Sequence, residues 1–175
     1  MIFKEKWDVL DELGNPLGRT VFRGDNTLKS GEYHLVVHIW VVSSKGDFLI
    51  QKRAADKKLM PGEWAATGGA AITGEDSYTA ANRELFEELG ISSTPHTLKK
   101  IARIKRRNSL LDVWFVVNES KTNELKLQKS EVAEAKWVTK SQLMQMISSG
   151  KFHNYGKEYF DKVFSEIDKS RRAAI

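Results

Sequence analysis

The segment 69–91 constrains the fold of this chain more than any other part of the sequence. Its apolar side chains recur at helical spacing, at Tyr78, Ala81, Leu85 and Leu89. This spacing predicts an amphipathic helix with one stripe facing a core. The run 73–76, TGED, is typical of a capping box at a helix start, and Gly90 is typical of a helix end.

The same helix carries an acidic face beside the apolar stripe. Glu84, Glu87 and Glu88 stand at i, i+3 and i+4, so they share one side of the helix. Carboxylates this close repel one another unless a cation lies among them. Oxygen ligands of this kind suit Mg²⁺ or Mn²⁺, which bind through few carboxylates together with substrate phosphates and water. On an ordinary helix, a solvated acidic face is the competing interpretation.

The complete spacing of the segment adds a more specific signal. Gly69, Glu75 and the run 83–91, RELFEELGI, follow the pattern G-x5-E-x7-R-E-U-x-E-E-x-G-U, where U is aliphatic. This pattern resembles the Nudix box. The resemblance implies an α/β fold, the Nudix α/β/α sandwich with a mixed sheet. It also implies a MutT-like hydrolase that uses Mg²⁺, or Mn²⁺, to cleave a diphosphate linkage by water attack on phosphorus.

The resemblance assigns a role to each defined residue of the box. The family's metal ligands correspond to the backbone carbonyl of Gly69 and to Glu84, Glu87 and Glu88. Glu87 and Glu88 are therefore expected to be catalytic as well. The family's arginine corresponds to Arg83, which should pair with Glu75 and orient the acidic cluster. The glycines of the run 67–69 are expected to form a tight loop that approaches the metal.

Sequence outside the box resembles the isopentenyl-diphosphate-isomerase-like branch of the family. The similarity lies in the segments 7–11, 31–40, 51–54 and 60–64. However, the isomerase's catalytic cysteine corresponds to Gly69 and one of its metal-binding histidines to Ala71, and this chain contains no cysteine. Hydrolysis is therefore favoured, with an isomerase-like protein or a non-catalytic diphosphate-binding module as the alternatives.

Two basic residues and one acidic residue outside the box are candidates for the site. The isomerase holds its substrate diphosphate with an arginine and a lysine that correspond to Arg53 and Lys57. For Lys57, a solvated loop is an equal alternative. Many family members use a further glutamate as metal ligand or general base, and Glu131, six residues before Trp137, fits that position. Glu134 is the second choice, and a surface carboxylate remains the alternative for both.

Histidines and a basic run leave further possibilities open. His34 and His38 are two residues apart in a predicted strand and should share a face. A paired metal site is conceivable there, but hydrogen-bonded core histidines are favoured. His153 is expected to pack at the last helix. The basic run 99–107 is interpreted first as a solvated loop, then as a phosphate-steering surface, and only third as an RNA-binding one.

The remaining elements follow from periodicity and turn signals. The segments 7–10 and 20–22 flank a Gly/Pro turn and predict an N-terminal β-hairpin. The predicted strands are 33–43, 48–53, 98–104, 111–117 and 133–139, and the predicted helices are 141–149, with a serine cap, and 156–169. The segment 33–43 is apolar on both faces, which is typical of a buried central strand.

Composition limits the class of protein. The 175 residues suit one domain, 1–175, with a sizeable core. The absence of cysteine excludes disulfides and thiolate chemistry. The net charge of +5 suits an anionic small-molecule diphosphate and is too small to indicate nucleic acid. Without an apolar leader or a membrane-length apolar run, a cytoplasmic protein is expected. A homodimer and the group carried by the diphosphate (nucleoside, nucleotide sugar, isoprenoid or thiamine-type) stay open.

Overall fold

The computed structural model describes residues 4–172. Its strands are β1 (Lys6–Leu10), β2 (Pro16–Phe22), β3 (His34–Val42), β4 (Phe48–Arg53), β5 (Trp64–Ala65), β6 (Thr67–Ala70), β7 (Lys99–Lys105), β8 (Ser109–Val117) and β9 (Val132–Val138). Its helices are α1 (Ser77–Leu89), α2 (Lys140–Ser148) and α3 (Lys157–Arg172), with a 3-10 turn at Thr122–Glu124. No helix in this described range is long and apolar enough to cross a membrane.

A mixed sheet of seven strands is organised around β3. The strand order is β5-β4-β3-β8-β7, with β6 also paired to β3 and β9 to β4. β3 and β8 run parallel from His34 opposite Ser109 to Val42 opposite Val117. The other pairings are antiparallel. Eight of the nine residues of β3 are buried, which confirms the predicted central strand.

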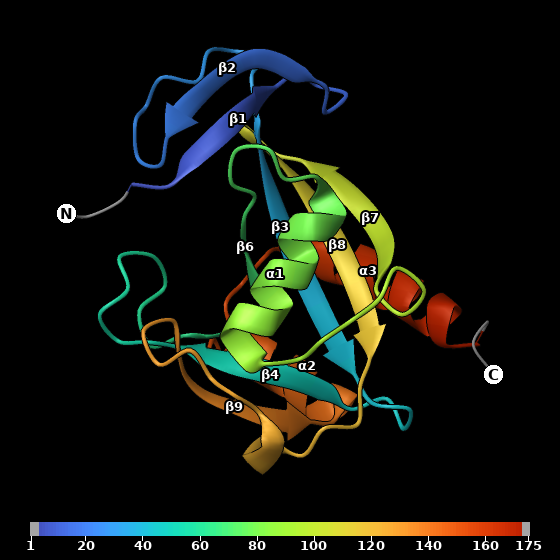
Figure 1. Ribbon diagram of the computed structural model, residues 1–175. Helices are drawn as coiled ribbons and strands as arrows, with labels where there is room; N and C mark the ends of the chain where they lie inside the picture. Colours follow the sequence, from blue (N-terminus) through green and yellow to red (C-terminus); the bar gives the residue numbers. More distant parts are fainter. Residues whose placement is uncertain (1–3, 173–175) are drawn as a thin grey trace.

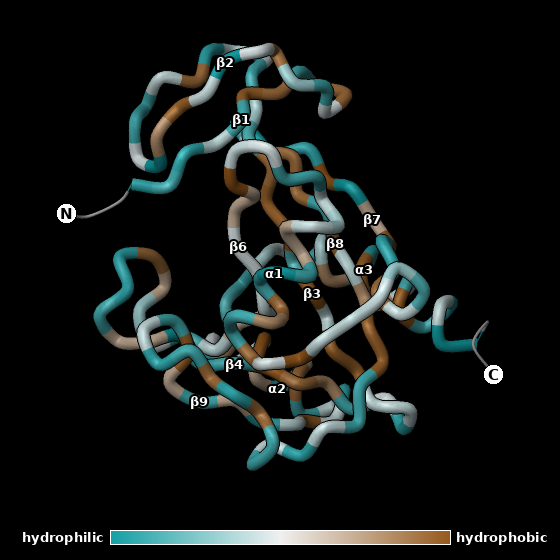
Figure 2. The backbone as a smooth tube through the Cα atoms, viewed as in Figure 1, coloured by the Kyte–Doolittle hydropathy of each residue, from teal (hydrophilic) through white to brown (hydrophobic). Residues whose placement is uncertain are grey.

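Helices cover both faces of this sheet, as Figure 1 shows. Along β3, Val37, Ile39 and Val41 belong to the core beneath α1. Trp40 and Val42 belong to the opposite core, beneath α2 and α3. Neighbouring residues of a strand point to opposite faces, so one apolar strand supplies both cores. Figure 2 shows the hydrophobic residues concentrated in these central strands. The arrangement confirms the predicted α/β sandwich.

The N-terminal hairpin forms a separate two-stranded sheet. β1 and β2 pair antiparallel, with Trp7 opposite Val21, and a bridge between Leu10 and Tyr33 joins the hairpin to the start of β3. In Figure 1 the hairpin stands over one end of the body. The predicted hairpin is therefore confirmed, and its position brings residues of β1 and β2 toward the end of the sheet where β3 begins.

The start of α1 differs from the sequence expectation. Asp76, and not a capping box beginning at Thr73, caps the helix and accepts a hydrogen bond of 2.7 Å from the Thr79 backbone. The predicted box is wrong because Asp76, the acidic residue expected at its third helical position, is itself the N-cap, so the helix starts three residues later. The predicted end is confirmed, because Gly90 adopts the left-handed conformation, with φ of 71°, that glycine tolerates.

The cap of α2 also differs from the expectation. Thr139, rather than Ser141, caps the helix and accepts a hydrogen bond of 3.1 Å from the Gln142 backbone. The Gln142 side chain reciprocates by accepting from the Thr139 backbone at 2.9 Å. The predicted serine cap is wrong because this reciprocal capping box starts the helix earlier.

Part of the basic run forms a buried ion pair. β7 contributes Lys100 and Arg103, which contact the fully buried Asp112 of β8 at 2.7 Å and 2.6 Å. Burial opposes the charge of Asp112, but the hydrogen bonds from Arg103 and Lys100 outweigh it, so its pKa lies below 3.8. The solvated-loop interpretation is therefore wrong for these two residues, because their charges neutralise a buried carboxylate.

Replacing Asp112 by Asn should lower the free energy of unfolding by about 1–3 kcal/mol. This loss of stability is smaller than the loss on breaking a fully buried ion pair, because Lys100 and Arg103 are both partly exposed. Because the folded-state pKa of Asp112 is depressed, its contribution is present above about pH 4 and is lost as the pH falls below that value. Denaturant unfolding of both proteins at several pH values measures this difference.

The exposed pair of Glu12 with Lys105, 3.2 Å apart, provides the control. Glu12→Gln should change the free energy of unfolding by less than about 0.5 kcal/mol. Equal effects of the two substitutions would contradict the assignment of Asp112 as a buried structural charge.

Candidate active site

A cavity of about 670 Å³ opens at the end of the sheet where β3 begins. Its walls come from α1, β3, β6, the N-terminal hairpin and the loop that precedes α3. Among the residues predicted from the sequence, those that line it are Arg53, Gly69, Arg83, Glu84, Glu87, Glu88 and Glu131. Residues from distant parts of the chain therefore meet in one space.

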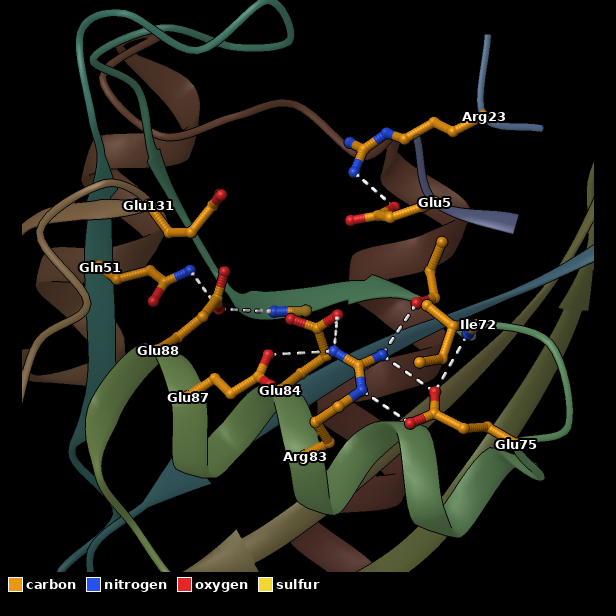
Figure 3. A network of polar contacts seen from close by, with 12 residues as sticks. Glu5, Arg23, Gln51, Ile72, Glu75, Arg83, Glu84, Glu87, Glu88 and Glu131 are labelled. Carbon is orange, nitrogen blue, oxygen red and sulfur yellow. Dashed lines mark hydrogen bonds and ion pairs between the residues drawn. The ribbon is translucent and has the colours of Figure 1, made fainter. Parts of the chain in front are cut away.

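The acidic face of α1 forms one wall of this cavity (Figure 3). Glu87 is exposed, Glu84 is partly buried, and Glu88 has only 2% of its surface accessible. Burial raises the pKa of Glu84 above its ordinary value, although the neighbouring Arg83 opposes the shift. The three glutamates thus line the same cavity but differ in how far they are exposed to solvent.

Arg83 partly neutralises the acidic face and ties it to the preceding loop. Its Nε and Nη2 atoms donate to the two carboxylate oxygens of Glu75 at 2.7 and 2.9 Å. Nη1 donates to Glu84 at 2.9 Å and to Glu87 at 3.1 Å, and Nη2 also donates to the Ala70 carbonyl at 3.1 Å. The bidentate contact with Glu75 fixes the guanidinium plane, so Arg83 holds two of the three cavity glutamates in place.

Glu88 is held by the sheet. Its Oε2 accepts hydrogen bonds of 2.8 Å from the Gln51 side chain and 3.2 Å from the Gly68 backbone. Burial, reinforced by the charge of Glu84, raises the pKa of Glu88 to about 8. Gln51 is a site residue that the sequence did not mark. It follows the apolar run 48–50 of β4 and precedes Lys52 and Arg53, so its position gives no local sign of its burial.

The glycines of the run 67–69 belong to a strand, so the predicted tight loop is wrong. They form part of β6, paired with β3, and neither Gly68 nor Gly69 has a positive φ. A Cβ atom on Gly68 would overlap the Val37 carbonyl oxygen, and one on Gly69 would overlap the Glu84 carboxylate. Position 68 requires glycine because β6 lies too close to the β3 backbone for a side chain, whereas a side chain at position 69 would displace the Glu84 carboxylate.

Two guanidinium groups line the same cavity as the acidic wall. Arg53, at the end of β4, has 8% of its surface accessible, and its Nε donates to the Leu59 carbonyl at 3.0 Å. Arg106 follows β7 and lines the same cavity. Within residues 4–172 neither side chain forms an ion pair with a carboxylate. Their positive charge is therefore available to an anion in the cavity.

Lys57 and the two candidate glutamates outside the box, Glu131 and Glu134, differ in their position relative to the cavity. Lys57 is absent from the cavity lining and forms an ion pair with Glu131, which does line the cavity. Glu134 lies on β9, exposed and opposite Lys52, away from this lining. Of the two outer glutamates, Glu131 is the one placed near the acidic wall.

The histidines of β3 lie on the cavity floor. The His34 ring stacks on Trp7, with ring centroids 4.0 Å apart, and His38 contacts Tyr159 of α3. The His34 Nδ1 and Trp7 Nε1 atoms are buried without a hydrogen-bond partner among the described residues. His153 also lines the cavity; it contacts Glu63 at 2.7 Å and packs edge-on against Tyr155, which in turn packs against α3.

Several cavity residues gave no local sequence signal. Glu5 and Arg23 of the hairpin form an ion pair of 2.8 Å at the cavity (Figure 3), and Asn154 and Tyr155 precede α3. Each reaches the site through a contact between distant segments, which periodicity does not reveal. For Arg106 alone, the basic run supplied an indication.

The donor set of the acidic wall suits a hard divalent cation. Glu84, Glu87 and Glu88 offer carboxylate oxygens, and Gly69 brings its backbone beside Glu84. Such oxygens fit Mg²⁺ or Mn²⁺. Within the described residues no three His, Asp or Glu side chains are arranged to hold a metal ion. Glu84 accepts a hydrogen bond from Arg83, and Glu88 accepts from Gln51 and the Gly68 N–H. The oxygen ligands of the acidic wall therefore suit a divalent cation, and in this structure the carboxylates are hydrogen-bonded to other protein groups.

The fold and this acidic helix define a Nudix domain. A family model described as NUDIX domain matches residues 32–160. The chain is 40% identical over 152 residues to the Nudix hydrolase lmo0368 of Listeria monocytogenes, over 86% of this chain and 89% of that protein. It is 29% identical over 115 residues to the nucleoside triphosphatase NudI of Escherichia coli, over 59% of this chain and 81% of that protein.

Solved structures show the same fold. DR0079 from Deinococcus radiodurans superposes with a TM-score of 0.71 at 23% identity, over 86% of this chain and 93% of that one. The NUDIX domain of Shewanella oneidensis NrtR, complexed with ADP ribose, gives 0.54 at 16% identity, over 69% and 80%. The chain belongs to the Nudix hydrolase family, whose members generally hydrolyse diphosphate linkages.

The two glycines of β6 should respond differently to alanine. Gly68→Ala should lower the free energy of unfolding by about 2–3 kcal/mol, because the new methyl group would meet backbone that cannot move without breaking the β3–β6 pairing. Gly69→Ala should cost about 1 kcal/mol or less, because the Glu84 carboxylate can rotate away. It should instead weaken Mg²⁺ binding. Denaturant unfolding and calorimetric Mg²⁺ titration measure the two effects, and equal losses of stability would contradict this account.

Proposed function

We propose that this protein hydrolyses the diphosphate linkage of a small molecule of the form X–O–P–O–P–Y by attack of water on phosphorus. The distribution of charge in the cavity carries the proposal. One wall presents Glu84, Glu87 and Glu88, and the same cavity presents Arg53 and Arg106 without carboxylate partners in the described chain. A cavity that combines a cation-binding wall with anion-binding groups suits a substrate that carries both phosphates and their metal ion.

The residues divide into metal-holding and phosphate-holding groups. Glu84, Glu87, Glu88 and the Gly69 carbonyl would hold Mg²⁺, with Mn²⁺ as the alternative. The bound ion would neutralise phosphate charge and lower the pKa of the attacking water. Arg83, fixed by Glu75, keeps Glu84 and Glu87 in position for that role.

Glu131 is the proposed proton acceptor for the attacking water. It lines the cavity near the acidic wall, and its contact with Lys57 holds its side chain in place. This changes the role proposed for Lys57, which would orient Glu131 instead of binding phosphate. Arg53 and Arg106 would bind the phosphate oxygens, since guanidinium groups match their geometry.

The group X is tested by a panel of diphosphates. The names of NudI, a nucleoside triphosphatase, and of the ADP-ribose complex of NrtR support placing nucleoside-bearing compounds first. The resemblance of the outer segments to the isopentenyl-diphosphate-isomerase-like branch supports including isoprenoid diphosphates. Product analysis with Mg²⁺, with Mn²⁺ and after chelation identifies the substrate and the metal requirement. Absence of metal-dependent turnover on every compound would overturn the proposal.

The same panel tests the isomerase alternative. The position that corresponds to the isomerase cysteine is Gly69, which carries no thiol, and Ala71 is buried and offers no metal ligand. Isopentenyl diphosphate should therefore show no conversion to its isomer. Formation of dimethylallyl diphosphate without phosphate release would favour isomerisation over hydrolysis.

Glu87→Gln and Glu88→Gln should each lower kcat by about 10³-fold with the best substrate. This corresponds to roughly 4 kcal/mol of transition-state stabilisation through a bound metal ion. Folding should survive, because each change removes one charge from a repulsive cluster. Steady-state kinetics measure the loss. Glu166→Gln, which alters a partly exposed glutamate of α3 paired with Lys169 and absent from the cavity lining, is the matched control and should leave kcat unchanged. A metal-site variant with near-wild-type turnover would contradict the metal assignment.

Arg53→Ala should lower kcat/KM by about ten- to a hundredfold, since a charge-assisted hydrogen bond contributes roughly 1.5–3 kcal/mol. Arg53→Lys should recover part of the loss, because lysine keeps the charge but lacks the planar donor fork. Kinetics and thermal melts are compared for both variants. Unchanged kcat/KM with lower thermal stability would show instead that Arg53 serves the structure through its contact with Leu59.

A further inference from the structure

His38 belongs to a buried chain of hydrogen bonds that the hydrolytic residues do not use. Its Nδ1 lies 2.8 Å from the hydroxyl oxygen of Tyr159, and the Trp40 Nε1 lies 3.0 Å from the same oxygen. His38, Trp40 and Tyr159 are all buried, and the ring of Tyr155 packs against His38 with centroids 4.7 Å apart. The imidazole is therefore fixed in position by α3 and by the loop before it.

The partners determine which nitrogen of His38 carries the proton. The Trp40 indole can only donate, so the Tyr159 oxygen accepts from it. If His38 Nδ1 also donated to that oxygen, the Tyr159 hydrogen would lack an acceptor, because the described chain gives this hydroxyl no other partner. Leaving a buried donor unpaired is costly. The arrangement that satisfies all three groups has Tyr159 donating to Nδ1, which leaves the proton of His38 on Nε2.

The Nε2 atom faces the cavity. It has no hydrogen-bond partner within residues 4–172. It is not fully enclosed by protein, and His38 lines the cavity. Burial lowers the pKa of His38 to about 3, with the nearby charges of Arg106 and His153 acting in the same direction. The ring is therefore neutral near pH 7 and presents one N–H donor beside a guanidinium group.

We propose that His38 is a substrate-binding residue whose Nε2–H donates to a phosphate oxygen that Arg106 also contacts. Tyr159 and Trp40 are the positioning residues that hold it in the donating tautomer. His38 lies opposite Gly68 in the β3–β6 pairing, and the Gly68 N–H holds Glu88. The donor therefore stands next to the acidic wall, where a diphosphate bridging the two walls would pass. This inference rests on the proposed diphosphate substrate.

Nitrogen NMR tests the tautomer and the contact without turnover. In protein with ¹⁵N-labelled histidine, His38 should show a protonated Nε2 and an unprotonated Nδ1. Adding methylenediphosphonate with Mg²⁺ should shift the Nε2–H resonance, while the resonances of His96, remote from the cavity lining, stay in place. A proton on Nδ1, or an Nε2–H signal unmoved by saturating ligand, would overturn the proposal.

Two amide variants separate donor loss from structural damage. Gln reaches the position of Nε2 and Asn that of Nδ1, so His38→Gln keeps a donor in the cavity and His38→Asn keeps only the partner of Tyr159. His38→Asn should raise KM by about five- to tenfold with a smaller change in kcat, on the scale of one lost hydrogen bond. His38→Gln should stay within about threefold of wild type. Equal KM values for the two folded variants would overturn the proposal.

The outcomes distinguish this inference from the proposed function. A ligand-dependent shift of the Nε2–H signal without hydrolysis of any diphosphate would support the His38 contact and reject the hydrolase proposal. Hydrolysis with an unmoved Nε2–H signal would support the hydrolase proposal and reject the His38 contact. Tyr159→Phe adds an independent check, because loss of its hydroxyl should alter the tautomer equilibrium of His38 that the NMR spectrum reports.

Discussion

The site depends on the close approach of β6 to β3 on one side and to α1 on the other. The approach is possible because Gly68 and Gly69 carry no Cβ atoms. It lets a backbone N–H of the sheet reach the Glu88 carboxylate, which Gln51 also binds. A helix and a sheet packed through ordinary side chains would lie farther apart, and this carboxylate could then not be held by a strand backbone. The position of Glu88 in the acidic wall thus depends on the absence of a side chain at Gly68.

Charges in the cavity are arranged at the expense of local stability. Glu88 is desolvated, which raises its pKa to about 8, and Arg53 is buried without a carboxylate partner in the described chain. Asp112 shows the contrast, because it is equally buried but has two cations and a lowered pKa. A buried charge that serves only the structure is neutralised within the protein. In the cavity, by contrast, charged groups are buried without full neutralisation by the protein, as a binding site for ions and phosphates requires.

Local patterns in the sequence predicted the elements but not all of their contacts. The helical stripe of α1 and the apolar run of β3 are strong periodic signals, so both were predicted correctly. The capping box was predicted wrongly because Thr73 and Asp76 are both residues that favour a cap, and the local pattern does not show that the helix begins at Asp76. The glycines at 68 and 69 were predicted to serve a loop, whereas they lie in β6, where close contact with the β3 backbone requires glycine at 68. The hairpin residues Glu5 and Arg23 reach the cavity through tertiary contacts that no local pattern records.

Polar residues within apolar strands mark the site more generally. β3 presents its odd-numbered Val37 and Ile39 to the core beneath α1, while its even-numbered face changes from His34 and His38 at the cavity to Trp40 in the second core. One strand face therefore serves binding at one end and packing at the other. Burying an imidazole without hydrogen-bond partners is costly. Histidines within an apolar strand therefore indicate where the sheet stops packing against a core and starts to line a cavity. The fold thus supports its cavity with the same strands that stabilise it.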